Sequence, residues 1–254
     1  MGMRALKSML CMYTRQMLGL LYFYTMGYLR RESVMWLGSI LDTVAMLTLL
    51  ILIGRGTLFP HILVGASIAF AYGAGVGQLS VDLVGLRLSK FKYVFVSSPL
   101  SPTIYMIGAA IGMSIPSLIY LIPIVSIVVA IQRPGLAAVF QYLVVLLCVW
   151  IIGIGLGFLI ASFSRTSIHA MYASRVLISL TVYLMPVYYP LSSLPEYIRI
   201  LTFVSPTTHA ALIARSLLGI SGAASSSLNY IALGLFTTAI PVVALKYGRW
   251  REND

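Results

Sequence analysis

The sequence predicts an all-α integral membrane protein whose chain crosses the bilayer six times. The 254 residues are 60% hydrophobic and only 9% charged, with a mean hydropathy of +0.98, whereas soluble domains carry about 25% charged residues. Six segments each supply the roughly 20 apolar residues that a membrane helix needs. This composition excludes a water-soluble enzyme, a disordered regulator and a secreted disulfide scaffold.

An N-terminal segment, residues 1–32, precedes a single transmembrane domain, residues 33–254. Arg4, Lys7 and Arg15 recur at helical spacing with apolar residues on the opposite side, which predicts a basic amphipathic helix in the inner interface. Residues 16–29 are apolar but would extend only about 21 Å as a helix, too short for a further span. No small-residue cleavage site follows, so a cleavable signal peptide is not expected.

The spans are predicted from uninterrupted apolar runs. In chain order they are Ser33–Ile53, His61–Val81, Thr103–Ile131, Leu136–Phe163, Thr166–Tyr189 and Leu228–Tyr247. Pro116 and Pro123 should bend the third span, and Pro186 and Pro190 should break or end the fifth, because proline removes an intrahelical hydrogen bond.

The basic residues predict the orientation. With the N-terminus inside, 13 Lys and Arg residues fall in the inner segments and 4 in the outer ones. Cytoplasmic loops of membrane proteins carry this excess of positive charge. We therefore expect a multi-pass protein of the cell (plasma) membrane with both termini in the cytoplasm.

Between the fifth and sixth spans, the outer region 190–227 predicts two short re-entrant or outer helices. Ser193 and Pro195 are start signals for a helix over 195–204. Ser205 and Pro206 are the same signals for a second helix, which should end at Leu218, before Gly219. Both are too short and apolar to stand free in water, so they should dip into the outer leaflet or cover a cavity mouth.

Asp42 lies mid-way along the first span, where an aspartate costs about 2.5–3.5 kcal/mol. It is either a substrate-path or gating residue or a structural hydrogen-bond donor or acceptor to a neighbouring helix. Tyr183 and Tyr188, near the outer end of the fifth span, favour an interfacial belt, with contact to a substrate as the alternative. Two glycine clusters favour close helix packing over a hinge. They are Gly73, Gly75, Gly77 and Gly153, Gly155, Gly157.

The inner loop 82–102 combines basic and aromatic residues and ends in Ser98-Pro99-Leu100-Ser101. It is either an ordinary interfacial loop or a surface that docks into a groove on a soluble partner.

Sequence motifs give no reason to expect catalysis or a cofactor. The chain has no glycine-rich phosphate-binding loop followed by lysine, and its three histidines stand far apart, with no metal-ligand spacing. Gly219–Gly222 matches the G-x-S-G of intramembrane serine proteases, but every histidine precedes Ser221, and the run favours a linker. We expect no catalytic residue and no metal or cofactor on this chain.

These features, in this order, resemble the membrane (permease) subunit of ATP-binding-cassette exporters of the type-2 permease family. The likeness covers nearly the whole chain. The carrying motifs are the basic N-terminal helix, Ser98–Ser101, the outer stretch Tyr189–Pro195, and Ser205–His209 followed by Arg215. The family often has Asn where this chain has Ser205.

The resemblance implies a half-transporter that moves an amphiphilic or hydrophobic substrate outward, such as a drug, a lipid or a lipid-linked glycan. A second permease copy, most simply in a homodimer, and separate nucleotide-binding ATPase subunits carrying ATP and Mg would be its partners, and nucleic acid would not. The coupling residues would be Asp82, Arg87, Lys90, Phe91 and Lys92. A polytopic scaffold without transport, or a lipid-modifying or intramembrane enzyme, is the alternative, and an ATP-independent facilitator is a third.

Overall fold

The computed structural model describes residues 12, 14–26, 41, 44, 48, 52, 58–89, 102–220 and 226–247, without the side chains of 102–106, 109, 117, 119 and 120. All regular structure in this part of the chain is helical. Within it, three helices are long and apolar enough to cross a membrane, or four if one bent helix is included. The first predicted span, with Asp42, lies outside the described residues except at four positions, so six spans stay a prediction.

The second predicted span is one continuous helix that is longer than expected. It comprises α3 (Phe59–Gly73), the π-helical turn η1 (Ala74–Gln78) and α4 (Leu79–Leu88). The prediction that a loop begins at Asp82 is therefore wrong, since residues 82–88 are helical. Val84 is buried with Ala161 and Ala170, and this packing stabilises the additional helical turns.

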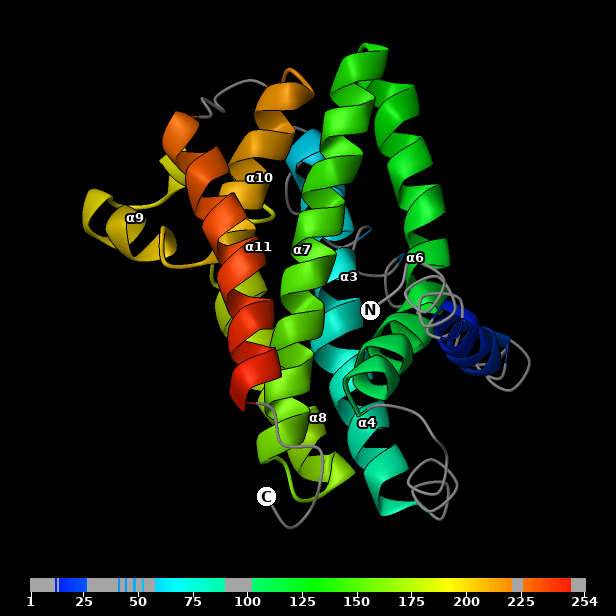
Figure 1. Cartoon of the computed structure of the whole chain (residues 1–254). Helices are drawn as coiled ribbons and strands as arrows, with labels where there is room; N and C mark the ends of the chain where they lie inside the picture. The colour runs from blue at the N-terminus through cyan, green and yellow to red at the C-terminus, as the bar shows by residue number, and fades with distance from the viewer. Residues whose placement is uncertain are drawn as a thin grey trace, which may run out of the picture.

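The third and fourth predicted spans form a hairpin of α6 (Pro102–Gln132) and α7 (Leu136–Phe163). α7 has the predicted bounds. α6 contains Pro116 and Pro123, and its parts Ala110–Pro116 and Leu121–Gln132 are inclined at 56°, which confirms the predicted bend. The sixth predicted span is α11 (Ser227–Tyr247). In Figure 1, α7 runs through the centre of the bundle, with α3 behind it and α11 beside it.

The fifth predicted span is a shorter helical run. It consists of α8 (Ser167–Ile178) and a second π-helical turn, η2 (Ser179–Tyr183), followed by turns up to residue 189. Thr166 caps α8 by accepting a hydrogen bond from the His169 backbone N–H at 3.2 Å. The helix ends before Pro186, as predicted.

Two short α-helices lie within residues 190–227, as predicted, and the location of this region on the outer side stays a prediction. They are α9 (Glu196–Thr202) and α10 (Pro206–Leu217), preceded by a 3₁₀ turn, η3 (Leu191–Ser193). Gly219 has φ +68°, a left-handed conformation that ends the helix, as expected of glycine there. Neither predicted start residue caps its helix with its side chain, because Ser193 lies inside η3 and the Ser205 hydroxyl donates to the Thr181 carbonyl oxygen. α9 projects away from the bundle in Figure 1.

Glycines allow the close approach of α7 to the second span. A Cβ atom on Gly75 would clash with the Gly153 backbone, and one on Gly157 would clash with the Gly75 carbonyl. On a different face of α7, a Cβ on Gly155 would clash with Ile240 of α11. Gly73 and Gly77 have no such close neighbour, so close packing explains four of the six predicted positions.

The N-terminal helical stretch 14–26 packs on α6. Leu20 and Tyr24 are buried against Gly108 and Gly112, and the Thr25 hydroxyl donates to the Gly112 carbonyl at 3.2 Å. The two glycines stand four residues apart, the small-residue spacing that brings membrane helices together. Arg15 is exposed near the start of this stretch.

Candidate functional site

One face of α8 and η2 is exposed along its whole length. Its centre is a stripe at positions i, i+4, i+7, i+11 and i+15, namely Ile168, Tyr172, Arg175, Ser179 and Tyr183. The opposite side carries Ala170, Ser174 and Val182, which are buried in the bundle. Ile168, Tyr172 and Tyr183 are each at least half exposed, so this face contacts little else in the described part of the chain.

Arg175 stands at the middle of this run, eight residues after Ser167 and eight before Tyr183. Eight residues correspond to about 12 Å along a helix. A charged side chain at the centre of a membrane helix costs about 2.5–3.5 kcal/mol when it faces lipid. The part of the stripe around Arg175 and Ser179 is therefore suited to contact water, protein or a polar ligand rather than lipid.

The predicted pair Tyr183 and Tyr188 lies at the C-terminal end of this face. Their rings stack with centroids 6.1 Å apart and planes inclined by 11°. Tyr183 is 50% exposed, whereas Tyr188 is buried, and its Cα lies close to Gly65 of α3. The Tyr183 ring is thus exposed on one side and is held on the other side by the buried ring of Tyr188.

Arg215 of α10 fixes the turn that follows η2. Its guanidinium donates to the carbonyl oxygens of Pro186 and Tyr189, both at 3.0 Å, and to that of Val187. The side chain is only 1% exposed, and burial lowers the pKa of Arg215 to about 10. The group stays protonated at neutral pH, and its charge strengthens the bonds to the three carbonyls.

Two further contacts connect the outer helices to the bundle. The Ser205 and Thr207 hydroxyls both donate to the Thr181 carbonyl, and η2 leaves this oxygen accessible to them. His209 lies between the Phe203 carbonyl, 2.8 Å from Nε2, and Oδ1 of Asn229 on α11, 3.0 Å from Nδ1. The C-terminal end of the exposed face, at η2, is therefore bonded to the start of α10, and α10 is in turn bonded to α11.

Arg87 joins the C-terminal end of α4 to the C-terminal end of α7. Its guanidinium donates to the carbonyl oxygens of Ala161, at 3.3 Å, and Ser164, at the C-terminal end of α7, where carbonyls lack helical partners. Asp82 accepts a bond of 3.1 Å from the Gln78 side chain. Both residues lie on α4 rather than in a loop.

The comparison with known proteins decides the family. Residues 15–218 match the family described as ABC-2 type transporter, which covers most of the chain. The chain belongs to the ABC-2 type transporter family. Its role is accordingly that of a permease subunit of an ABC transporter, a transport subunit whose ATP-binding partner is a separate subunit. No curated protein sequence matches this permease.

The family match contains most of the described features. It begins at Arg15 and ends at Leu218, so it includes the α8 face, the tyrosine pair, Arg87 and Arg215. α11, which holds Asn229, lies beyond it. Several predicted site residues lie outside the described residues, namely Arg4, Lys7, Asp42, Lys90, Phe91 and Lys92.

Arg175 of this ABC-2 permease counts in the sequence only as one more inner cation, and its position on the exposed stripe was not predicted. The signal was present, because residues 168, 172, 175 and 179 repeat at helical spacing on one face. The His209–Asn229 contact was also missed. It joins residues 20 positions apart and leaves no local pattern.

Proposed function

We propose that the chain is one half of an exporter that moves an amphiphilic or hydrophobic substrate outward, such as a drug, a lipid or a lipid-linked glycan. ATP is hydrolysed on a separate subunit. The proposed setting is the cell (plasma) membrane, with both termini in the cytoplasm. The observation that carries the proposal is the exposed face of α8 and η2, which presents Arg175 among tyrosine and aliphatic side chains.

Two copies of the chain, facing each other across this stripe, would remove Arg175 from lipid and enclose a path lined by polar and apolar groups. Tyr183 and Tyr188 lie where such a path would open outward, and Asp42 is proposed as a further path or gating residue. A face that carries both polar and apolar side chains suits an amphiphile, because the polar and apolar parts of the substrate can each contact side chains of their own kind.

The coupling surface is proposed at the inner end of the second span. Asp82 and Arg87 stand on α4, and the basic and aromatic residues Lys90, Phe91 and Lys92 follow directly in the sequence. The N-terminal cations Arg4, Lys7 and Arg15 would lie in the adjoining interface. Arg87 supports this arrangement because it connects the segment before Lys90 to α7, so a push on the docking segment would reach the bundle.

Co-purification tests the proposal. The tagged permease, co-expressed with ATP-binding subunits from its own source, should retain an ATPase, and Lys90→Glu with Lys92→Glu should reduce the retained amount at least tenfold. Lys246→Glu, which reverses a cation at the end of α11, is the matched control and should have little effect. A chain that purifies alone, or an ATPase whose capture ignores both lysines, would contradict the coupling role.

The dimer is tested separately by the mass of the particle in nanodiscs, where two copies of the 27.7 kDa chain are expected. A scaffold protein or an ATP-independent facilitator would show no capture of an ATPase. A lipid-modifying enzyme would change the chemical structure of a lipid in the absence of any ATPase subunit.

A further inference from the structure

Arg175 lacks a counter-charge in the described part of the chain. The two carboxylates there are Asp82, which accepts a bond from Gln78, and Glu196 at the start of α9, and neither forms an ion pair with Arg175. Arg165, which precedes the same helix, is also exposed. Arg175 is therefore the one charged side chain on the stripe, and neither carboxylate in the described part of the chain neutralises it.

Arg175 is not explained as a helix cap. The backbone N–H of Ser179 bonds to the carbonyls of Arg175 and Val176, and the helix continues into η2, so no free helix end lies beside the guanidinium. Arg87 and Arg215, in contrast, both donate to free carbonyls. Arg175 differs from them in having its donors available.

The neighbours of Arg175 define what could use those donors. Tyr172 and Ser179 flank it on the stripe, and they offer hydroxyl groups. Val176 and Leu180, 59% and 48% exposed, continue the same face as a hydrocarbon surface. A planar guanidinium binds phosphate or carboxylate oxygens in pairs, so the combination matches an anionic head group with an attached apolar chain.

We propose that Arg175 binds the anionic head group of an amphiphile lying along α8, with its apolar chain toward Val176 and Leu180. The proposal rests on the transport role of this face and specifies the substrate class as acidic rather than neutral. A phosphate head group could belong to the cargo or to a bilayer phospholipid, and both sources share the chemistry that Arg175 recognises.

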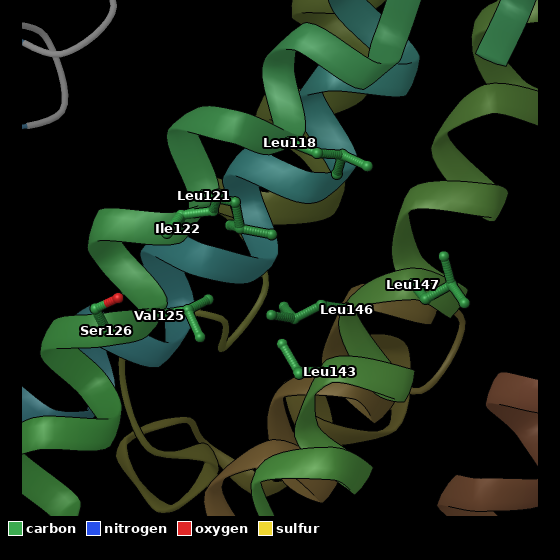
Figure 2. A pocket seen from close by; sticks show the side chains of 8 residues that line it. All are labelled: Leu118, Leu121, Ile122, Val125, Ser126, Leu143, Leu146 and Leu147. Atoms are coloured by element: carbon green, nitrogen blue, oxygen red, sulfur yellow. The ribbon is translucent and has the colours of Figure 1, made fainter. Parts of the chain in front are cut away.

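Two photoreactive probes test this inference on the full-length chain in phosphatidylcholine nanodiscs. Both have a dodecyl chain with a diazirine, and the head group is a phosphate monoester in one and a hydroxyl in the other. A groove of about 340 Å³ between α6 and α7 supplies an internal reference, because seven of its eight lining residues are apolar and Ser126 is the exception. Figure 2 shows Leu121 and Val125 of α6 on one side of it and Leu143 and Leu146 of α7 on the other. Both probes should label this groove equally.

The phosphate probe should label peptides of α8 and η2 at least tenfold more than the hydroxyl probe. Arg175→Gln should remove that excess without changing the groove, and Arg175→Lys should keep part of it. Arg133→Gln, at an exposed arginine in the α6–α7 turn, is the matched control and should change nothing on α8. Unchanged labelling of the groove confirms that each variant is folded. If Arg175→Gln does not fold, the partial loss expected in Arg175→Lys tests the inference instead.

Nanodiscs containing 30% phosphatidylglycerol distinguish the two sources. Loss of the α8 signal there identifies a bilayer phospholipid as an occupant, and persistence identifies a cargo-like amphiphile. Equal labelling of α8 by both probes, or an excess that survives in Arg175→Gln, would overturn the inference. So would an excess that appears only in Asp42→Asn, because Asp42 would then be the partner of Arg175. Capture of an ATPase without head-group discrimination refutes this inference alone, whereas discrimination without capture refutes the exporter.

Discussion

Arg87 donates to the carbonyl oxygen of Ser164, 77 residues further along the chain. The contact joins the last turn of α4 to the residue that follows α7. A single side chain thereby fixes the C-terminal ends of α4 and α7 to each other, just before the proposed coupling residues Lys90, Phe91 and Lys92.

Replacing Arg87 by Ala should destabilise the permease by about 1–3 kcal/mol, because the carbonyls of Ala161 and Ser164 lose a charged donor. The thermal midpoint in detergent measures the effect. Lys90→Ala is the control and should leave the midpoint unchanged. Equal midpoints for Arg87→Ala and the wild type would show that the Arg87 contacts contribute nothing. Charge reversal at Arg87 would therefore test docking and stability together, whereas the lysines test docking alone.

Gly153→Ala should destabilise the bundle by about 1–3 kcal/mol or prevent folding, since a Cβ atom there would clash with the Tyr72 carbonyl. Gly73→Ala is the matched substitution and should be neutral or slightly stabilising, because nothing lies within 4 Å of the added atom. The yield of monodisperse protein and its thermal midpoint report both. Similar losses for the two variants would contradict the packing described for α7.

Arg215→Met should reduce the folded yield sharply, because three carbonyls around residues 186–189 would lose their donor in a buried place. The expected loss is about 3 kcal/mol, measured by unfolding in detergent. Arg199 offers a comparison, since it also donates to two carbonyls but in a more exposed position. Arg199→Met should cost less than about 1 kcal/mol, and a larger loss there than at Arg215 would refute the argument from burial.

His209 and Asn229 should be energetically coupled. In a double-mutant cycle with His209→Ala and Asn229→Ala, the two losses should fall short of additivity by about 0.5–1.5 kcal/mol, as for one buried hydrogen bond. Thermal unfolding of the four proteins supplies the data. Thr238→Ala replaces Asn229→Ala in a control cycle and should be additive, because Thr238 bonds only within its own helix.

The sequence predicts the long helices well where an apolar run has clear stops. α7 begins after Pro134-Gly135 and ends at Phe163, before Ser164, and its bounds were predicted correctly. α4 was cut short at Asp82, because a charged residue in a basic stretch resembles a loop until Val84 is seen packed against Ala161. In this case tertiary packing determines the end of the helix.

The candidate site was only partly predictable. The bend of α6 was predicted from its prolines, whereas the position of Tyr183 and Tyr188 at the outer membrane interface stays a prediction. The partners of Arg215 were not predictable, since its carbonyl acceptors lie 26 to 29 residues earlier. Arg175 entered the sequence prediction only as one of the cations that indicate the orientation. It becomes a candidate binding residue because the structure shows it exposed at the middle of the α8–η2 helical run.

The attachment of the outer helices has a mechanical consequence. Ser205 and Thr207 hold them to η2, Arg215 to the turn at residues 186–189, and His209 to α11. Because α10 is bonded to three separate elements, it cannot move away from the bundle by itself. Any movement of α10 away from the bundle must therefore carry η2 and the start of α11 with it, so this end of the permease would open as one unit.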